Sequence, residues 1–307
     1  MDRLIGRTLG DFRVLDLIGQ GSMARVYRAV QLSLNRPVAL KVFQEGLLTP
    51  GDFVERFHRE AEYLARFEHP NILPVYASGE EGDLHYFALR LIEGGTLSEW
   101  LLSKPSVRQV FALMRDVARG LARLHERGGL HRDLKPSNVL IEGGTGILAD
   151  FGLARLMEDS TITQSGAAVG TPAYMSPEQW RGEKATPASD VFSFGVILYE
   201  ALSGRHPYAQ GAADWQGQLA GSRARFTQLR REGLMEAVAK GPPPPMEAEG
   251  VPPGIEDVVR RCLAAERNDR FATATELERA LDAVVWPEED VGTSPTLRRG
   301  NSPAQRT

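Results

Sequence analysis

The sequence has a single cysteine, no long apolar run and no excess of positive charge. Because Cys262 has no second cysteine to pair with, a disulfide within the chain is excluded, which fits a reducing, intracellular setting. The most apolar stretch, 191–202, is interrupted by Ser193, Gly195 and Glu200, and it falls short of the roughly 18 apolar residues that a membrane span needs. The formal net charge of -4 argues against a nucleic-acid partner bound through bulk positive charge.

The chain is long and apolar enough to fold, with 307 residues of which 42% are hydrophobic. A chain of this length usually exceeds one compact core, so we expect one large lobe or two cooperating lobes. The N-terminus, MDRLIGRTLGDF, lacks the apolar core and the cleavage site of a secretory signal. Apolar neighbours predict that Cys262 is a packed core residue. We therefore expect a cytoplasmic protein with no membrane span in this chain.

The hydrophobic pattern changes along the chain. Alternating apolar residues typical of β-strands occupy three segments, 12–42, 72–78 and 84–92. The spacing of three and four residues that is typical of amphipathic helices occupies five, 51–68, 106–127, 190–203, 255–265 and 273–284. The sequence therefore predicts a β-rich first third and an α-rich remainder with a hinge near 92–96. Proline-rich 240–254 is expected to be a connector, and the polar segment from Pro287 onward a disordered tail.

A glycine-rich segment joins two of the predicted strands, Ile18-Gly19-Gln20-Gly21-Ser22-Met23-Ala24-Arg25-Val26. Glycines allow backbone N–H groups to approach a polyphosphate, because no Cβ stands in the way. Two glycines between strands are also compatible with a simple hairpin. A dinucleotide-binding motif would need a helix after the loop, whereas Val26, Arg28 and Val30 alternate as a second strand. The pattern favours a flap over phosphates.

A lysine lies in the middle of the apolar strand Val38-Ala39-Leu40-Lys41-Val42. Alternation places Ala39 and Lys41 on the opposite face from the other three residues. A lysine among apolar side chains is costly unless it has a partner, although it could also extend to solvent from an edge strand. Glu60, at the margin of the buried face of the following helix, is a candidate partner. Such a pair would hold the ammonium where it can meet α- and β-phosphates.

The segment from 130 to 140 concentrates the groups that phosphoryl transfer requires. It follows an amphipathic helix and contains a proline, so we expect a loop that leads into a short strand. Asp133, Lys135 and Asn138 supply a carboxylate for the attacking hydroxyl, a cation for the γ-phosphate and a polar metal ligand. Asp150, in the sequence Asp150-Phe151-Gly152 after another apolar segment, can bind magnesium.

With these motifs the chain resembles the Hanks-type serine/threonine protein kinases common in bacteria, over residues 12 to 285. The resemblance implies an α+β, two-lobed protein kinase fold: a small antiparallel β-rich N-lobe with one main helix over 1–92, and a larger α-helical C-lobe over 93–286, followed by a tail or linker over 287–307. It implies an enzyme that transfers the γ-phosphoryl group of ATP to Ser/Thr hydroxyls of proteins in signal transduction.

The resemblance also implies roles for single residues. Lys41 would contact the α- and β-phosphates with Glu60 as its anchor, Asp133 would be the catalytic base with Lys135 beside it, and Asn138 and Asp150 would hold Mg²⁺, or Mn²⁺ in its place. The nucleotide site would take in the nine flap residues from Ile18 to Val26. Its adenine pocket would be formed by Val26, Ala39, Leu140, Leu89 at the gatekeeper position and Leu91 at the hinge, where neighbouring Arg90 is expected to point to solvent.

Downstream, the segment from Gly170 to Glu178 resembles the substrate-docking part of these kinases, with Ser176 in place of the usual alanine. The resemblance implies that Glu178 pairs with Arg270 and that Asp190 binds the backbone of the catalytic loop. It also implies autophosphorylation, with Thr163 and Ser165 as the favoured sites, and self-association for that step.

Two other functions stay open. A pseudokinase scaffold usually lacks the lysine, the base or a metal ligand, all of which are present at 41, 133, 138 and 150. A small-molecule phosphotransferase on the same fold would not need the segment from 170 to 178.

Overall fold

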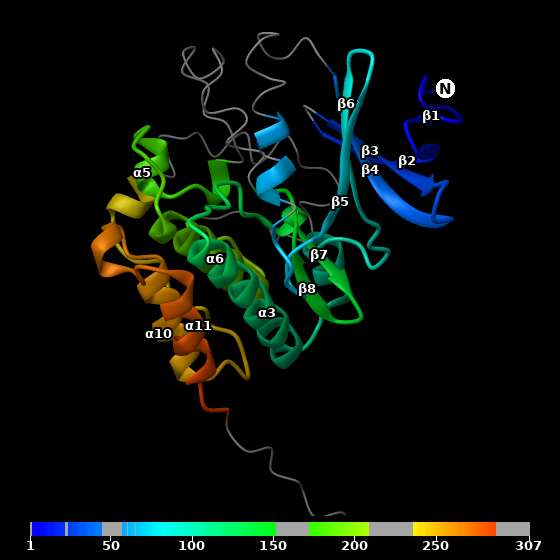
Figure 1. Cartoon of the computed structure of the whole chain (residues 1–307). Helices are drawn as coiled ribbons and strands as arrows, with labels where there is room; N and C mark the ends of the chain where they lie inside the picture. Colours follow the sequence, from blue (N-terminus) through cyan, green and yellow to red (C-terminus); the bar gives the residue numbers. More distant parts are fainter. Residues whose placement is uncertain are drawn as a thin grey trace, which may run out of the picture.

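The computed structural model describes residues 2–21, 24–44, 57–59, 61–64, 66–151, 172–208 and 236–286. Its first part is a sheet with the order β1-β2-β3-β4-β6-β5, in which every neighbouring pair is antiparallel. The strands are β1 (Thr8–Leu9), β2 (Phe12–Gln20), β3 (Ala24–Gln31), β4 (Arg36–Gln44), β5 (Val75–Glu81) and β6 (Leu84–Arg90). Figure 1 shows this sheet on one side of the molecule and the helices on the other.

The alternation in β4 divides its side chains between two apolar clusters, as the sequence predicts. Val38, Leu40 and Val42 lie in a cluster on the outer face of the sheet. Ala39 and Phe43 face the main core, which includes Phe57, Ala61 and Leu64 from the helical residues 57–59 and 61–64. The predicted antiparallel β-rich region with one helix is therefore confirmed.

The N-terminal segment covers the outer face of the sheet, a feature that the sequence pattern did not indicate. Leu4 and Leu9 are buried in the outer cluster. Asp2 accepts hydrogen bonds of 3.0 Å from the Leu4 backbone N–H, from Arg25 and from the Tyr27 hydroxyl. These contacts tie the start of the chain to β3.

The strand predicted at 72–78 begins later, because β5 starts at Val75. Ile72 instead forms an isolated parallel bridge to Leu148, and the Leu73 backbone N–H donates to the Leu148 carbonyl at 2.8 Å. Pro74 has no N–H for a sheet. Residues 72 and 73 therefore join the two halves of the molecule.

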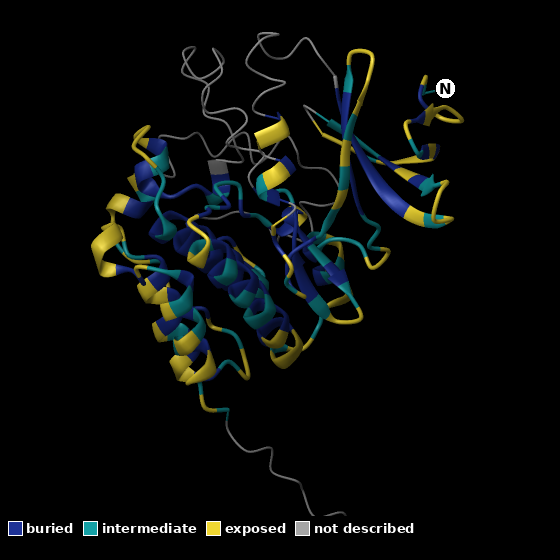
Figure 2. Cartoon of the chain, in the orientation of Figure 1, coloured by how far each residue is buried: buried dark blue, intermediate teal, exposed yellow. Residues whose placement is uncertain are grey.

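Helices form the second part, around a central helix α6. The helices are α2 (Leu97–Trp100), α3 (Val107–Glu126), α5 (Pro177–Trp180), α6 (Pro187–Ser203), α10 (Pro253–Cys262) and α11 (Ala274–Asp282). Figure 2 shows α6 almost entirely buried, while α10 and α11 keep exposed faces. Cys262 is fully buried against α6, so its predicted place in the core is confirmed.

Two helices differ from their predicted bounds by as much as three residues at one end. α6 begins at Pro187 and not at 190, because Thr186 caps it and proline is favoured in the first turn. α10 spans Pro253–Cys262, so it starts two residues earlier and ends three residues earlier than the apolar periodicity indicated. None of the helices built from described residues combines the length and apolar character that crossing a bilayer requires.

Candidate active site

A short hairpin places two polar residues at one end. The hairpin consists of β7 (Val139–Glu142) and β8 (Thr145–Leu148), with Val139 opposite Leu148. Asn138 therefore precedes the first strand at the same end at which Asp150 follows the second. The Ala149 backbone N–H donates to the Asn138 carbonyl at 2.9 Å and fixes this arrangement.

Asp133 is the centre of a hydrogen-bonded cluster beside that hairpin. Lys135 Nζ lies 2.6 Å from Asp133 Oδ2. Asn138 Nδ2 donates to the Asp133 carbonyl at 2.8 Å and to Oδ2 at 3.2 Å. Asp133 and Lys135 keep about a quarter of their side chains exposed, 25% and 22%, so a substrate can reach them.

Asp190 at the start of α6 holds the loop that carries Asp133. Its carboxylate accepts the backbone N–H groups of His131 and Arg132, each at 2.8 Å, and contacts His125 Nε2 at 2.9 Å. Burial alone would raise the pKa of Asp190, but the contacts with His125 and with the loop bring that pKa below its ordinary value. The predicted bond between Asp190 and the loop backbone is confirmed.

Lys41 reaches the same site from the sheet. Its Nζ lies 2.6 Å from Asp150 Oδ1, and its side chain is only 10% exposed. Burial would raise the pKa of Asp150, but the ammonium of Lys41 brings it below the ordinary value. Lys41 and Asp150 thus form one pair and Asp133 and Asn138 another, and the backbone bond from Ala149 to Asn138 links the two. Glu60, the predicted partner of Lys41, lies outside the described residues.

The residues expected around adenine come from β3, β4, β6 and β7 and from Leu91 directly after β6. Ala39 lies opposite Leu89 in the sheet, and Val26 lies opposite Lys41. Val26, Leu91 and Leu140 are partly buried against the main core. Leu89 also lines a small pocket beside Lys41, Asp150 and Phe151. The sheet and the hairpin therefore bring these residues to the same region.

The glycine-rich segment joins the antiparallel strands β2 and β3, the strand–loop–strand order that the sequence predicts, and its role as a flap over phosphates stays a prediction. Gly19 lies opposite Val26, Gln20 lies opposite Arg25, and the Gly21 N–H donates to the Ala24 carbonyl at 2.9 Å. Ile18 is exposed. Ser22 and Met23 lie outside the described residues.

The Arg90 side chain is 40% exposed and reaches solvent, as expected. Its guanidinium also forms an ion pair with Glu142 at the end of β7, which was not predicted. The partner lies 52 positions away in the sequence, so the local pattern could not identify it.

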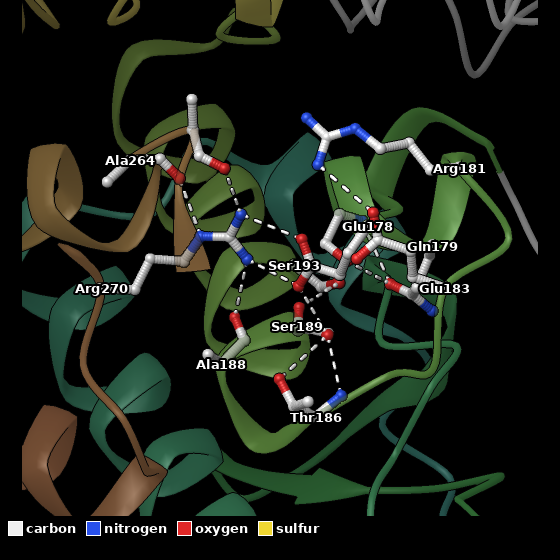
Figure 3. A network of polar contacts seen from close by, with 12 residues as sticks. Glu178, Gln179, Arg181, Glu183, Thr186, Ala188, Ser189, Ser193, Ala264 and Arg270 are labelled. Atoms are coloured by element: carbon white, nitrogen blue, oxygen red, sulfur yellow. Dashed lines mark hydrogen bonds and ion pairs between the residues drawn. The ribbon is translucent and has the colours of Figure 1, made fainter. Parts of the chain in front are cut away.

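Glu178 and Arg270 form the predicted ion pair in the helical part. The Arg270 guanidinium binds both carboxylate oxygens, at 2.8 Å and 3.1 Å, and also donates to the carbonyls of Ala188, Ala264 and Ala265. Figure 3 shows the two side chains facing each other. Burial would raise the pKa of Glu178, but hydrogen bonds from Arg270 and Ser189 bring that pKa below its ordinary value.

Polar residues in and after α6 hold the segment at 173–174. Ser193 Oγ donates to the Tyr174 carbonyl at 2.7 Å, and the Tyr174 hydroxyl donates to Glu200 Oε2 at 2.8 Å. His206 Nε2 lies 2.8 Å from the Ala173 carbonyl. Burial raises the pKa of Glu200 to about 7 and lowers that of His206 to about 4. No sequence pattern indicated this role, although Ser193 and Glu200 stand out as polar interruptions of an apolar stretch.

The two-part fold and the Lys–Asp–Asn–Asp site define the class of protein kinase domains. The family model described as "Protein kinase domain" matches residues 12–281, and the chain belongs to this family. The predicted family and fold are therefore confirmed.

Bacterial serine/threonine kinases are among its relatives. The chain is 33% identical to PrkC of Bacillus subtilis over 279 residues, which are 90% of this chain and 41% of PrkC. It is 37% identical to PknL of Mycobacterium tuberculosis over 271 residues, covering 87% of this chain and 64% of PknL. The chain thus spans from about two fifths to nearly two thirds of these relatives. The kinase domain of PknI from Mycobacterium tuberculosis has the same fold, with a TM-score of 0.67 at 24% identity, covering 92% of this chain and 98% of that one.

Proposed function

We propose that this chain is an active serine/threonine protein kinase that transfers the γ-phosphoryl group of ATP to protein hydroxyls in signal transduction. One observation carries the proposal: the cluster of Asp133, Lys135 and Asn138 is intact and adjoins the ion pair of Asp150 with Lys41. A scaffold has no need to bury a lysine and to keep it directed at Asp150, close to Asp133, whose side chain is about a quarter exposed. Retention of all four groups favours catalysis.

Each group has a distinct task in this proposal. Asp133 accepts a hydrogen bond from the attacking hydroxyl and takes up its proton, while Lys135 neutralises charge on the γ-phosphate. Lys41 binds the α- and β-phosphates under the flap of Ile18 to Val26, and Glu60 anchors it. The adenine ring lies among Val26, Ala39, Leu89, Leu91 and Leu140, whose apolar side chains suit a flat aromatic ring.

Asn138 and Asp150 are the residues that would hold a metal ion. Asn138 uses its Nδ2 toward Asp133, which turns its amide oxygen away from that carboxylate. An amide oxygen and a carboxylate at the same end of one hairpin are the hard oxygen donors that Mg²⁺ and Mn²⁺ prefer. When bound, the metal ion neutralises charge that develops on the phosphates.

The regulation and surroundings of the reaction are also part of the proposal. Thr163 and Ser165, which lie outside the described residues, would be autophosphorylated by a second copy of the chain. A phosphate at either position could then pair with arginines such as Arg132 and order the segment. The N-lobe would span 1–92 and the C-lobe 93–286. A location in the cytoplasm would give the kinase access to ATP.

The test is transfer of label from radiolabelled ATP with Mg²⁺, using myelin basic protein as acceptor. Label should appear on protein with the wild type and disappear with Asp133→Asn, while ATP binding persists. Asp83→Asn, an identical change at an exposed turn residue, serves as the control and should keep full activity. Absence of transfer by the wild type would favour the scaffold, and label confined to a small-molecule acceptor would favour the other phosphotransferase.

A further inference from the structure

We propose that Gln179 is a positioning residue that holds the catalytic loop in place for phosphoryl transfer, an inference that rests on the kinase activity proposed above. Gln179 lies in α5, directly after Glu178. Its Nε2 donates a hydrogen bond of 3.2 Å to the backbone carbonyl of Arg132. Its Oε1 accepts from the Ser176 backbone N–H at 3.1 Å and from the Ser176 hydroxyl at 3.0 Å. One amide group therefore joins the docking segment to the loop that carries Asp133.

The backbone at Arg132 needs such support. Its φ is 64°, in the left-handed region, which is unfavourable for residues other than glycine. A conformation of this kind persists only where the surroundings impose it. The Arg132 N–H is held by Asp190 and its carbonyl by Gln179, so both polar groups of the strained residue are fixed. Because Asp133 is the next residue, its carboxylate depends on that geometry.

The other end of the bridge is rigid. Glu178 is locked by Arg270, and the neighbouring Trp180 side chain is buried, at 1% exposure. Figure 3 shows Gln179 extending from this anchored turn, next to Glu178. Ser176, in place of the family's usual alanine, is also buried and orients the amide through its hydroxyl. A fixed helical turn thus sets the position of the catalytic loop.

A competing explanation is that Gln179 only caps α5. The chain offers a matched case, because Gln109 accepts from the Ser106 N–H at 2.8 Å in the same arrangement at the start of α3. Gln109 is exposed, and among the residues that the structure describes its side chain hydrogen-bonds to Ser106. A glutamate keeps the capping acceptor but cannot donate to a carbonyl. Substitution of each glutamine by glutamate therefore separates bridging from capping.

The experiment compares Gln179→Glu, Gln179→Met and Gln109→Glu with the wild type in the full chain. It measures kcat, KM for ATP and Tm, with myelin basic protein as acceptor. We expect Gln179→Glu to lower kcat about tenfold, the effect of losing one hydrogen bond that aligns the reacting groups, with KM for ATP and Tm unchanged. Gln179→Met should lower kcat as much and lower Tm as well. Gln109→Glu should match the wild type.

Wild-type kcat in Gln179→Glu would overturn the role of Gln179 while leaving the kinase activity intact. The role would also be overturned if Gln179→Glu lowered Tm together with kcat and if kcat returned to the wild-type value at lower temperature. A purely structural role would then explain the loss. A wild type that transfers no label would refute the proposed activity and this role together.

Discussion

The ion pair between Glu178 and Arg270 yields a prediction whose size follows from its surroundings. Arg270 makes five hydrogen bonds, two to Glu178 and three to backbone carbonyls, and this uses every N–H of the guanidinium. The two side chains are 0% and 3% exposed. Substitution Arg270→Met keeps a comparable apolar volume but leaves Glu178 buried without its counter-charge.

Removing one partner of a buried ion pair costs about 3–5 kcal/mol, since the other charge loses both water and its partner. At roughly 2–4 °C per kcal/mol for a large domain, Tm should fall by about 6–20 °C. The three backbone carbonyls that lose a donor act in the same direction.

The assay is thermal unfolding followed by circular dichroism at neutral pH. Arg205→Met is the matched control, because Arg205 pairs with Glu247 on the surface, where the side chains are 52% and 72% exposed. Exposed pairs contribute little, so this control should change Tm only slightly. A change in Arg270→Met as small as that in the control would refute the reasoning from burial.

The same pair gives a pH dependence. The pKa of Glu178 in the folded chain lies below its ordinary value of 4.5, so the carboxylate stabilises the fold above that pH. The contribution is lost as pH falls through the folded pKa. Relative to the wild type, Glu178→Gln should therefore lose less stability on acidification.

Three further predictions concern the central helix and its neighbours. Gly195→Ala should lower Tm although alanine favours helices, because the added Cβ would lie 2.5 Å from Cys262 Cβ; a rise in Tm would contradict this. The stability of Glu200→Gln relative to the wild type should rise between about pH 5 and about pH 8, by at most about 3 kcal/mol. The pKa of Glu200 is raised to about 7, so its ionisation over this range costs the wild type folding free energy. The same Tm difference between variant and wild type at both pH values would contradict this. Cys262 should resist thiol reagents until the chain unfolds, because it is fully buried and burial raises its pKa; labelling of the native chain would show otherwise.

Local patterns predicted much of this molecule. The face of Lys41 follows from strand alternation alone, and the two polar residues at one end of the β7–β8 hairpin follow from short apolar segments flanked by Asn138 and Asp150. In each case the residues that decide the outcome lie within a few positions of each other. The change from a β-rich to an α-rich region follows from local patterns too, whereas the two-lobed kinase fold was implied by the family resemblance.

Contacts between distant segments could not be predicted in this way. The pairing of Arg90 with Glu142 and the bond from Gln179 to the Arg132 carbonyl depend on how separate elements pack. Gln179 did carry one local signal, because a serine three residues before a glutamine is a helix-capping pattern. That pattern predicts the cap but not the donor on its other side. The pairing of Glu60 with Lys41 stays a prediction.

The segment that precedes the family match has a practical consequence for anyone shortening the chain. The match begins at residue 12, yet Leu4 and Leu9 lie in the outer cluster, and Asp2 binds Arg25 in the glycine-rich segment. A version trimmed to start at Phe12 would expose apolar side chains of the outer cluster to water and remove the partner of Arg25. Affinity tags are better joined at the far end of the polypeptide.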